Sequence, residues 1–452
     1  MTKAAELSAK EGIAMFQESR PGQPLTAIIV GAGHRAIIYA NYALEHPEQL
    51  KILGIADPNP LRREWCRKTY GFPEENMFTS AEELAKRPRF ADAIINGTMD
   101  HQHVPTAIPL LRAGYHMLLE KPFAVNEEEM WELVKVAKET DRKVMICHVL
   151  RYSPFYSSIR QKILDGEIGE IIAMETVEHV SYHHMAVSYV RGKWRNQQTC
   201  HATMLLSKCS HDLDLIMWMN SGNEPVSVAS FGSNFQFHPG KMPEGAGKRC
   251  LLDCPKEVEE NCLYSAKKLF LDNPDRWGAY VWGDPEQAEK LTDEDRFNTL
   301  RDDSLFGKCI YQCDNDTVDH QTVIINFANG VTASHNMIAG CAKPMRSIHI
   351  TGTKGEIWGV HHEEEYTLRK IDPRPGCEYS EQIIDMHTAG GIGGAHGGGD
   401  DRLTEDFISY IQGSQPSISC TSVTDSVNGH LCVYLADKSR IEGAVKPVIK
   451  KE

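Results

Sequence analysis

The sequence predicts an α/β protein with an N-terminal doubly wound parallel sheet and a C-terminal α+β domain, whose large open sheet is mostly antiparallel. Up to residue 149, short apolar runs rich in β-branched residues alternate with segments of helical periodicity, which is typical of βαβ units. Beyond residue 150, the apolar runs indicate strands with few helices between them. The Asn329-Gly330 pair between two of these runs is a strong hairpin signal and favours antiparallel pairing.

The individual elements follow from these patterns. In the first domain we expect strands at 26–30, 51–56, 91–95, 115–119 and 143–147, and helices at 36–44, 61–70, 105–113 and 126–140. In the second we expect strands at 170–179, 226–233, 318–327, 331–338, 347–351 and 356–360, with a helix at 208–219 over one face. The expected domains are an N-terminal arm at 1–24, a first domain at 25–149 and a second at 150–452, with a cysteine-rich polar insertion at about 240–313.

Composition excludes several classes of protein. The chain of 452 residues carries 48 Lys and Arg against 62 Asp and Glu, a net charge of −14, without a basic run, so a nucleic acid would be repelled. No run reaches the roughly 18 apolar residues that a membrane span needs, and the N-terminus shows no apolar export signal. We therefore expect a cytoplasmic protein whose 13 cysteines are free thiols or metal ligands rather than disulfides.

A glycine-rich motif, Gly31-Ala32-Gly33-His34-Arg35-Ala36, directly follows the first expected strand. Gly31 permits a tight turn, and Gly33 lets the backbone approach a pyrophosphate, which would lie at the helix N-terminus that His34 and Arg35 begin. Asp57 ends the next strand 21 residues after Ala36, where a carboxylate accepts the ribose hydroxyls of NAD. The alternative is a plain strand-to-helix turn with a capping Asp.

We interpret this pattern as a Rossmann dinucleotide-binding domain that prefers NAD. Asp57 would repel the 2′-phosphate of NADP. Arg35, Arg62 and Arg63 are the exceptions to consider, since any one of them could reach such a phosphate.

Two further motifs carry groups able to move protons. Glu120-Lys121-Pro122 follows an expected parallel strand, at the sheet edge where open α/β sheets bind ligands. Lys208, His211 and Asp214 recur at intervals of three, which on a helix predicts roughly one shared face. Such a set suits proton transfer, because histidine titrates near neutrality. The alternative for the first motif is a surface lysine at the end of a strand. The alternative for the second is a polar, solvated stripe on a helix.

Together these residues resemble the Gfo/Idh/MocA family of nicotinamide-dependent oxidoreductases, from Ala27 to about Val445. The most specific part runs from Asn96-Gly97-Thr98 through His103 and Ala113-Gly114-Tyr115-His116 to Glu120-Lys121-Pro122. The resemblance implies that Lys121 lies at the nicotinamide and the substrate hydroxyl, and that His211 takes the substrate proton, with Asp214 as the acid three residues later. It implies a cofactor site made by Gly31, Gly33, His34, Arg35, Asp57, Thr98, His103, Glu120 and Lys121.

One departure from the family pattern concerns the base. Many dehydrogenases of the family have an Asp four residues before the histidine, where this chain has Ser207 followed by Lys208. The identity of the base is therefore open: Lys121 and His211 are the first candidates, and His183 and His184 are the next. The resemblance also implies a substrate pocket lined by Arg151, Tyr152, Trp194, Arg195, His211 and His396. His396 opens a glycine-rich loop before a helix at 403–411, which Asp400 or Asp401 would cap.

The cysteines of the insertion have a spacing that favours a structural zinc. Cys250-x3-Cys254-x7-Cys262 is followed after 46 residues by Cys309-x3-Cys313. Four thiolates in a loop region without a large core suit a tetrahedral zinc. We expect Cys250, Cys254 and Cys262 as ligands, with Cys313 or Cys309 as the fourth; small buried thiols are the alternative.

The function expected from these observations is hydride transfer between NAD and a hydroxyl-bearing carbon of a sugar or polyol. Lys121 or His211 would remove the hydroxyl proton. A glycosidase of the same family, which oxidises its sugar transiently and reduces the product again, is the alternative enzyme. A sensor or scaffold that binds NAD without turnover is the non-enzymatic alternative. The expected partners are a small carbohydrate and further copies of the chain, because a bare sheet face suits a dimer or tetramer.

Overall fold

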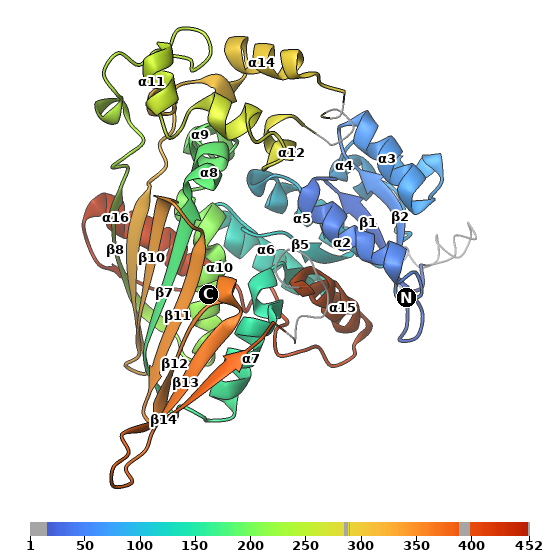
Figure 1. The fold of residues 1–452 in the computed structure, drawn as a ribbon. Coiled ribbons are helices and arrows are strands. Elements are labelled where there is room, and N and C mark those ends of the chain that lie inside the picture. The colour runs from blue at the N-terminus through green and yellow to red at the C-terminus, as the bar shows by residue number, and fades with distance from the viewer. Residues whose placement is uncertain (1–15, 284–287, 289, 388–397, 451–452) are drawn as a thin grey trace, which may run out of the picture. The chain divides into compact units, whose positions relative to one another are not determined.

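The computed structural model describes residues 16–283, 288, 290–387 and 398–450, which divide into two compact units (Figure 1). The first unit comprises the described residues within 1–123, 128–147 and 400–424, and the second those within 124–127, 148–399 and 425–452. The expected arm at 1–24 lies mostly outside the described residues. The structure differs from the expected domains at 25–149 and 150–452, because residues 400–424 belong to the first unit and residues 124–127 and 148–149 belong to the second.

The first unit contains a six-stranded sheet in the order β3-β2-β1-β4-β5-β6, with every neighbouring pair parallel. This order confirms the predicted doubly wound sheet. Its strands are nearly continuous buried apolar runs, as expected when helices cover both faces. They are β1 (Leu25–Val30), β2 (Leu50–Ala56), β3 (Met77–Phe78), β4 (Ala93–Asn96), β5 (His116–Leu119) and β6 (Val144–Ile146).

Local signals set the helices of this unit. In α3 (Pro60–Tyr70), Asn59 accepts the Leu61 N–H, proline stands in the first turn, and Gly71 ends the helix in the left-handed conformation. The other helices are α2 (His34–Glu45), α4 (Ala81–Ala85), α5 (His103–Arg112), α6 (Glu127–Thr140) and α15 (Gly399–Gln412). Helix α15 therefore begins before the expected 403–411, and Asp400 lies in its first turn rather than at the N-cap.

The second unit contains a nine-stranded sheet in the order β14-β13-β12-β11-β7-β10-β9-β8-β15. The pair β7–β10 is parallel and the other pairs are antiparallel, which confirms the mostly antiparallel sheet. The strands are β7 (Ile171–Ser181), β8 (Pro225–Ser233), β9 (His320–Phe327), β10 (Thr332–Cys341), β11 (Met345–Gly352), β12 (Gly355–Val360), β13 (Glu365–Ile371), β14 (Tyr379–Asp385) and β15 (Lys446–Pro447).

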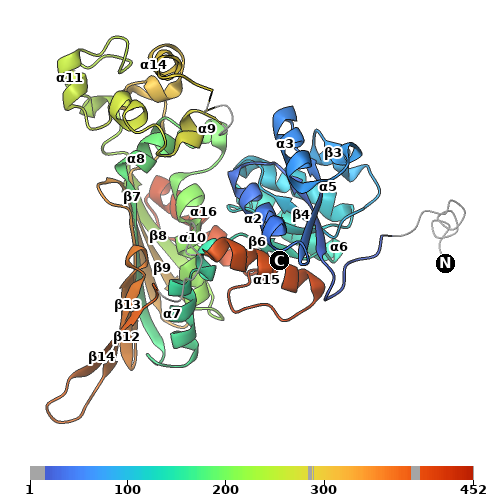
Figure 2. The ribbon, with the colours of Figure 1, turned by 45° about the vertical axis from the view of Figure 1, so that its right-hand side comes forward.

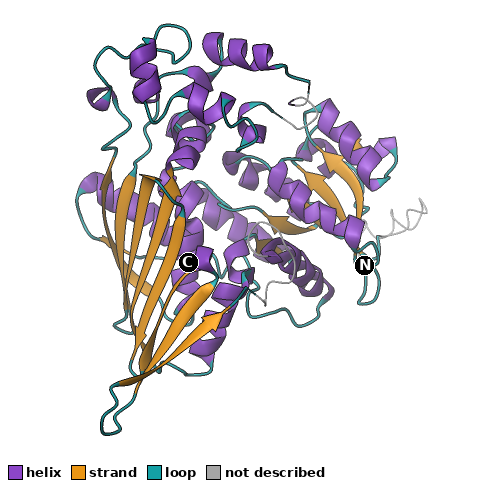
Figure 3. Cartoon of the chain, viewed as in Figure 1, coloured by secondary structure: helices purple, strands orange, loops and turns teal. Residues whose placement is uncertain are grey.

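Helices α10 (Met204–Met219) and α16 (Val427–Glu442) pack on one face of this sheet, as Figures 2 and 3 show. Along β9, Val323 and Ile325 are buried under that layer while Ile324 between them is exposed. This alternation is the period of two that a half-covered strand requires. The described residues contain no helix long and apolar enough to cross a membrane.

The insertion expected at 240–313 belongs to the second unit and is built from short helices. They include α11 (Lys256–Asn261), α12 (Gly278–Val281) and α14 (Asp293–Asp302). Two arginines organise its backbone. Arg249 donates to the carbonyls of Leu300, Arg301 and Ser304, and Arg191, which precedes the insertion, donates to the Lys308 carbonyl.

A buried network of charges joins α10 to the sheet. Lys208 Nζ lies 2.8 Å from Glu178 Oε1 on β7, and Arg346 Nε on β11 lies 2.7 Å from Glu178 Oε2 and 3.1 Å from Asp212 Oδ1. The two buried carboxylates depend on these cations, because an unpaired buried charge is strongly unfavourable.

We therefore expect Arg346→Leu to destabilise the second unit by about 3–5 kcal/mol, because it leaves two carboxylates buried beside one lysine. The matched control is Arg369→Leu on β13, whose exposed ion pairs with Glu356 and Glu381 are worth about 1 kcal/mol or less. Urea unfolding followed by fluorescence measures both. Equal losses in the two variants would contradict this account of the network.

Candidate functional site

The glycine-rich turn of the first unit has the shape of a phosphate cradle. Gly31 has φ +75°, and a Cβ placed there would lie 2.7 Å from Thr98 Cγ2. A Cβ on Gly33 would lie 3.4 Å from the Gly97 carbonyl oxygen. Gly33 is the N-cap of α2, its cap makes no side-chain hydrogen bond, and the first turn carries no acidic residue. The turn therefore fits a pyrophosphate, which a side chain would displace. His34 is exposed at the first helical position.

Asp57 lies directly after β2, beside this turn. It is 3% exposed; its Oδ2 accepts the Ala32 N–H at 2.8 Å, and its Oδ1 accepts the Asn59 N–H at 2.8 Å. These bonds hold the carboxylate against the turn, and each oxygen keeps capacity for a further donor. The position fits the ribose hydroxyls of a dinucleotide. Arg63 donates to the Asp57 carbonyl at 2.6 Å.

Arg35 and Glu120 belong to one ion-pair network of the first unit. Arg35 Nε lies 3.0 Å from Glu120 Oε1, and its Nη2 lies 2.5 Å from Asp400 Oδ1 on α15. Arg35 also donates to the Tyr39 hydroxyl, which in turn donates to Glu120 at 2.7 Å. Burial opposes ionisation of Glu120, but the Arg35 charge outweighs it and lowers the pKa of Glu120 below its usual value. The guanidinium of Arg35 is thus already bound to two carboxylates.

His103 ties two loops of the unit together. Its Nδ1 lies 2.7 Å from the Pro122 carbonyl oxygen, and its Nε2 lies 3.1 Å from that of Thr98. The loop after β4 and the Glu-Lys-Pro turn after β5 are thereby held at one sheet edge. Lys121 is half-buried on that turn, and its backbone N–H donates to Glu120 Oε2 at 2.9 Å. The structure thus gathers the expected Thr98, His103, Glu120 and Lys121 beside the glycine cradle.

In the second unit, His211 lies on α10 in a group of buried histidines. It is 9% exposed, and its ring centroid lies 6.0 Å from that of His148, which lies 5.8 Å from that of His430. Asp214 binds Arg151 through two bonds, of 2.7 and 2.6 Å, and its Oδ1 is 3.6 Å from His148 Nε2. The site therefore combines a titratable ring with a carboxylate whose charge is paired. Sequence reasoning missed His148 and His430, because single histidines far apart in the chain carry no pattern.

The expectation that Lys208 shares a helix face with Asp214 is wrong. Lys208 binds Glu178 on the sheet at 2.8 Å, whereas Asp214 binds Arg151. The two positions differ by six residues, about 120° around a helix. Ser207 donates its hydroxyl to the Thr203 carbonyl one turn earlier, at 2.8 Å. Neither residue supplies the carboxylate that the family places before its histidine.

The other expected substrate residues have distinct environments. Tyr152 and Arg151 are buried. Arg195 Nε lies 2.9 Å from Oδ1 of Asp314, the residue that directly follows the insertion. Trp194 is half-buried within an aromatic group. The centroid of its ring lies 6.0 Å from the ring centroid of Tyr189 and 4.1 Å from Lys193 Nζ. His396 lies outside the described residues.

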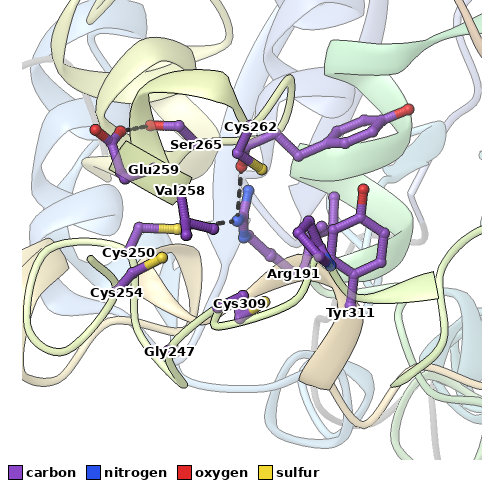
Figure 4. Close-up of a pocket in the computed structure, with 14 residues that line it drawn as sticks. Arg191, Gly247, Cys250, Cys254, Val258, Glu259, Cys262, Ser265, Cys309 and Tyr311 are labelled. Atoms are coloured by element: carbon purple, nitrogen blue, oxygen red, sulfur yellow. Dashed lines mark hydrogen bonds between the residues drawn. The ribbon is translucent and has the colours of Figure 1, made fainter. Parts of the chain in front are cut away.

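Among the described residues, we considered two groups of possible metal ligands. Cys250, Cys254, Cys262 and Cys309 line one cavity of the second unit, and Cys313 is not on its wall (Figure 4). Cys209, Asp212 and His335 have ligand atoms within 4.8 Å of one another. Two members of this second group already have partners, because Asp212 is paired with Arg346 at 3.1 Å and the His335 ring is hydrogen-bonded to Thr176 at 2.9 Å.

Comparisons with known proteins agree with this geometry. The family model "Oxidoreductase family, NAD-binding Rossmann fold" matches residues 25–148, and "Oxidoreductase family, C-terminal alpha/beta domain" matches residues 160–422. The YteT protein of Bacillus subtilis (strain 168) is 25% identical over 377 residues, which cover 79% of this chain and 82% of that protein. An inositol 2-dehydrogenase of Rhizobium meliloti (strain 1021) is 26% identical over 205 residues, 45% of this chain and 56% of that one. The structure of levoglucosan dehydrogenase with NADH and levoglucosan has the same fold, with a TM-score of 0.68 at 17% identity over 95% of this chain and all of that chain.

We expect Glu120→Gln to destabilise the first unit by about 1.5–3 kcal/mol near neutral pH, because it removes a buried charge-assisted bond to Arg35. The pKa of Glu120 is lowered in the folded state, so its contribution is complete above the unfolded value of about 4.3 and is lost as pH falls through the folded value. Thermal midpoints of the two proteins, measured from about pH 7 to about pH 3, should therefore converge in acid. The control is Glu381→Gln, which has an exposed partner. A difference that does not depend on pH would contradict the ion pair.

Proposed function

Because the chain belongs to the Gfo/Idh/MocA oxidoreductase family, whose models match residues 25–148 and 160–422, we propose that it is an NAD-dependent dehydrogenase of a sugar or polyol. The observation that carries this proposal is the edge of the parallel sheet in the first unit. There, the glycine cradle, the Asp57 carboxylate and Lys121 follow three different strands. That edge is where a doubly wound sheet binds a dinucleotide.

The proposed roles of the cofactor residues follow from their contacts. The turn at Gly31 and Gly33 and the start of α2 hold the pyrophosphate, and Asp57 accepts the ribose hydroxyls. Arg35 is bound to Glu120 and Asp400, which supports NAD over NADP because that guanidinium is not available for a 2′-phosphate. When bound, NAD supplies the redox chemistry by accepting a hydride at the nicotinamide ring.

The proposed proton acceptors are Lys121 in the first unit and His211 in the second. His211 suits general-base work because its ring is nearly buried and the paired charge of Asp214 lies one helical turn away. Lys208 is not proposed as a base, because its ammonium is committed to Glu178. The protein would thus bind and orient the substrate hydroxyl and remove its proton.

A carbohydrate substrate is supported by the relatives and by the aromatic group around Trp194. Trp277 stacks on His184 with centroids 4.2 Å apart, and Tyr280 lies between Trp277 and Trp194, at 5.1 and 6.4 Å from them. Aromatic faces beside lysine and histidine offer the mixed apolar and polar surface that a sugar ring needs. The inositol and levoglucosan enzymes named above support the same class of substrate.

The test of the proposal is a panel of sugars and polyols, including myo-inositol and levoglucosan, incubated with the full chain and excess NAD. A rise in NADH absorbance equal to the oxidised product supports the dehydrogenase. The glycosidase alternative is tested in the same panel with nitrophenyl glycosides and substoichiometric NAD. Many turnovers of nitrophenol per NAD, without accumulation of NADH, would replace our proposal by the glycosidase. NAD binding without any turnover would favour the sensor.

We also propose that the bare face of the nine-stranded sheet binds a second copy of the chain. Phe231, Ile324 and Trp358 point out of that face and are 71%, 48% and 47% exposed. Exposed apolar side chains on one sheet face are typical of an interface. Light scattering of the full chain measures the assembly, and a monomeric mass would contradict it.

We expect Asp57→Asn to weaken NAD binding roughly 10- to 100-fold, because a charged hydrogen bond is worth about 1.5–3 kcal/mol. Asparagine keeps one acceptor for the Ala32 N–H, so the turn should stay folded. Calorimetric titration with NAD and NADP measures both affinities, and the preference for NAD should shrink. Tighter binding of NADP than of NAD by the unmodified protein would overturn the assignment.

We expect Lys121→Ala and His211→Ala each to lower kcat by about 10²- to 10⁴-fold, the usual contribution of a general acid or base. NAD affinity should remain nearly unchanged, because neither residue is assigned to the adenosine half. The control is His387→Ala, an exposed histidine that pairs with Asp385. Full activity of one variant would assign the base to the other residue; full activity of both would refute the proposed chemistry.

A further inference from the structure

The insertion of the second unit brings four cysteines from three segments of the chain to one cavity. Cys250 and Cys254 come from the loop before α11, Cys262 follows that helix, and Cys309 comes from the returning segment. The cavity measures about 20 Å³, which is room for a single water-sized or ion-sized occupant. Figure 4 shows the four side chains around it.

Backbone pairing explains why Cys250 and Cys309 meet. Arg249 and Lys308 form an isolated antiparallel bridge. On either side of it, the Cys250 N–H donates to the Gly307 carbonyl at 3.0 Å, and the Cys309 N–H donates to the Lys248 carbonyl at 2.8 Å. The Cys254 N–H turns back to the Arg249 carbonyl at 3.2 Å. The positions of these cysteines are thus set by main-chain hydrogen bonds.

Arg191 gives the cavity an unusual electrostatic environment. It is 1% exposed and lines the cavity, and its Nη2 donates to the Tyr264 carbonyl at 2.9 Å and to Cys250 Sγ at 3.7 Å. Its Nη1 is buried without a hydrogen-bond partner. Among the described residues, no carboxylate lies within ion-pair distance of this guanidinium, and Glu259 on the cavity wall accepts from Ser265 instead. This buried guanidinium therefore lies beside thiols and has no ion-pair partner among the described residues, an arrangement that is unfavourable without a counter-charge.

We infer that Cys250, Cys254, Cys262 and Cys309 bind one structural zinc ion, with Arg191 as the cation that balances it. Four thiolates and Zn²⁺ carry a net charge of −2, so the site supplies the negative charge that Arg191 otherwise lacks. The N–H groups of Arg191 would donate to the bound sulfurs, which is how outer residues orient metal ligands. Binding releases the thiol protons to solvent, so neither oxidant nor co-reactant is needed.

The geometry distinguishes between the two candidates for the fourth ligand. Cys309 lies on the cavity wall, whereas Cys313 donates its thiol to the Cys309 carbonyl at 3.4 Å and does not line the cavity. Among the described side chains, the thiols of this cavity do not form a group within 4.8 Å, so binding requires them to rotate inward. The thiols must move until each sulfur lies about 2.3 Å from the same zinc ion, which is the usual zinc–sulfur distance. Four protein ligands leave no open position, so the metal ties the insertion together and takes no part in catalysis.

The first test is the metal content of the full chain, purified from zinc-containing medium without chelator. Mass spectrometry should find one zinc per chain, and cobalt exchanged into the protein should show the strong visible absorption of tetrahedral four-sulfur coordination. A zinc content near zero, or the weak absorption of six-coordinate cobalt, would overturn the inference. A metal-free protein in which the cavity cysteines are joined in disulfide bonds would also overturn it.

The matched variants are Cys309→Ser and Cys313→Ser. Each replaces one cysteine sulfur by oxygen, and the two positions are four residues apart. We expect Cys309→Ser to lose its zinc and Cys313→Ser to retain one zinc per chain. Equal retention in both, or equal loss, would contradict the assignment. Should Cys309→Ser fail to fold, titration of the unmodified protein with a mercurial reagent decides, because zinc release should follow modification of the four cavity thiols and not of the others. None of these measurements depends on enzymatic activity.

Discussion

Burying a carboxylate away from water requires a cation beside it, and this constraint decides which side chains of the protein are available for chemistry. In the first unit, Glu120 is buried at the end of β5 and is paired with Arg35 at 3.0 Å, which also binds Asp400. One ion-pair network therefore joins the helix after the glycine turn, the Glu-Lys-Pro turn and a helix from the far end of the chain. Lys121 is held in position because the preceding residue, Glu120, is fixed by this ion pair.

The same constraint operates in the second unit. Lys208 is paired with Glu178, and Arg151 is paired with Asp214. His211 lies on the same helix as Lys208, and its ring centroid is 6.0 Å from that of His148. Arg191 departs from the pattern, because its buried guanidinium donates to carbonyls and to a thiol and has no ion-pair partner among the described residues. The zinc–thiolate centre that we propose would supply the negative charge that this guanidinium lacks.

Local patterns predicted the parts of this structure that depend on neighbouring residues in the chain. The alternation of apolar runs predicted the parallel sheet, and the Asn329-Gly330 turn joins β9 to β10 as expected. The family resemblance is confirmed by both family models. Sequence reasoning failed where the partner is distant: Glu178, which binds Lys208, lies 30 residues earlier, and Asp400, which binds Arg35, lies 365 residues later. Helical spacing alone cannot show which cation a fold will bury.

The central claim is that the residues at the edge of the parallel sheet support direct hydride transfer from a sugar carbon to NAD. The measurement that tests it most directly is isotope transfer, using the reactive sugar of the panel deuterated at its carbon atoms. We expect one deuterium in the nicotinamide ring of NADH for each molecule of oxidised product, with no hydrogen from solvent. Oxidised product accompanied by unlabelled NADH, or deuterium that returns to the sugar while no NADH accumulates, would contradict it.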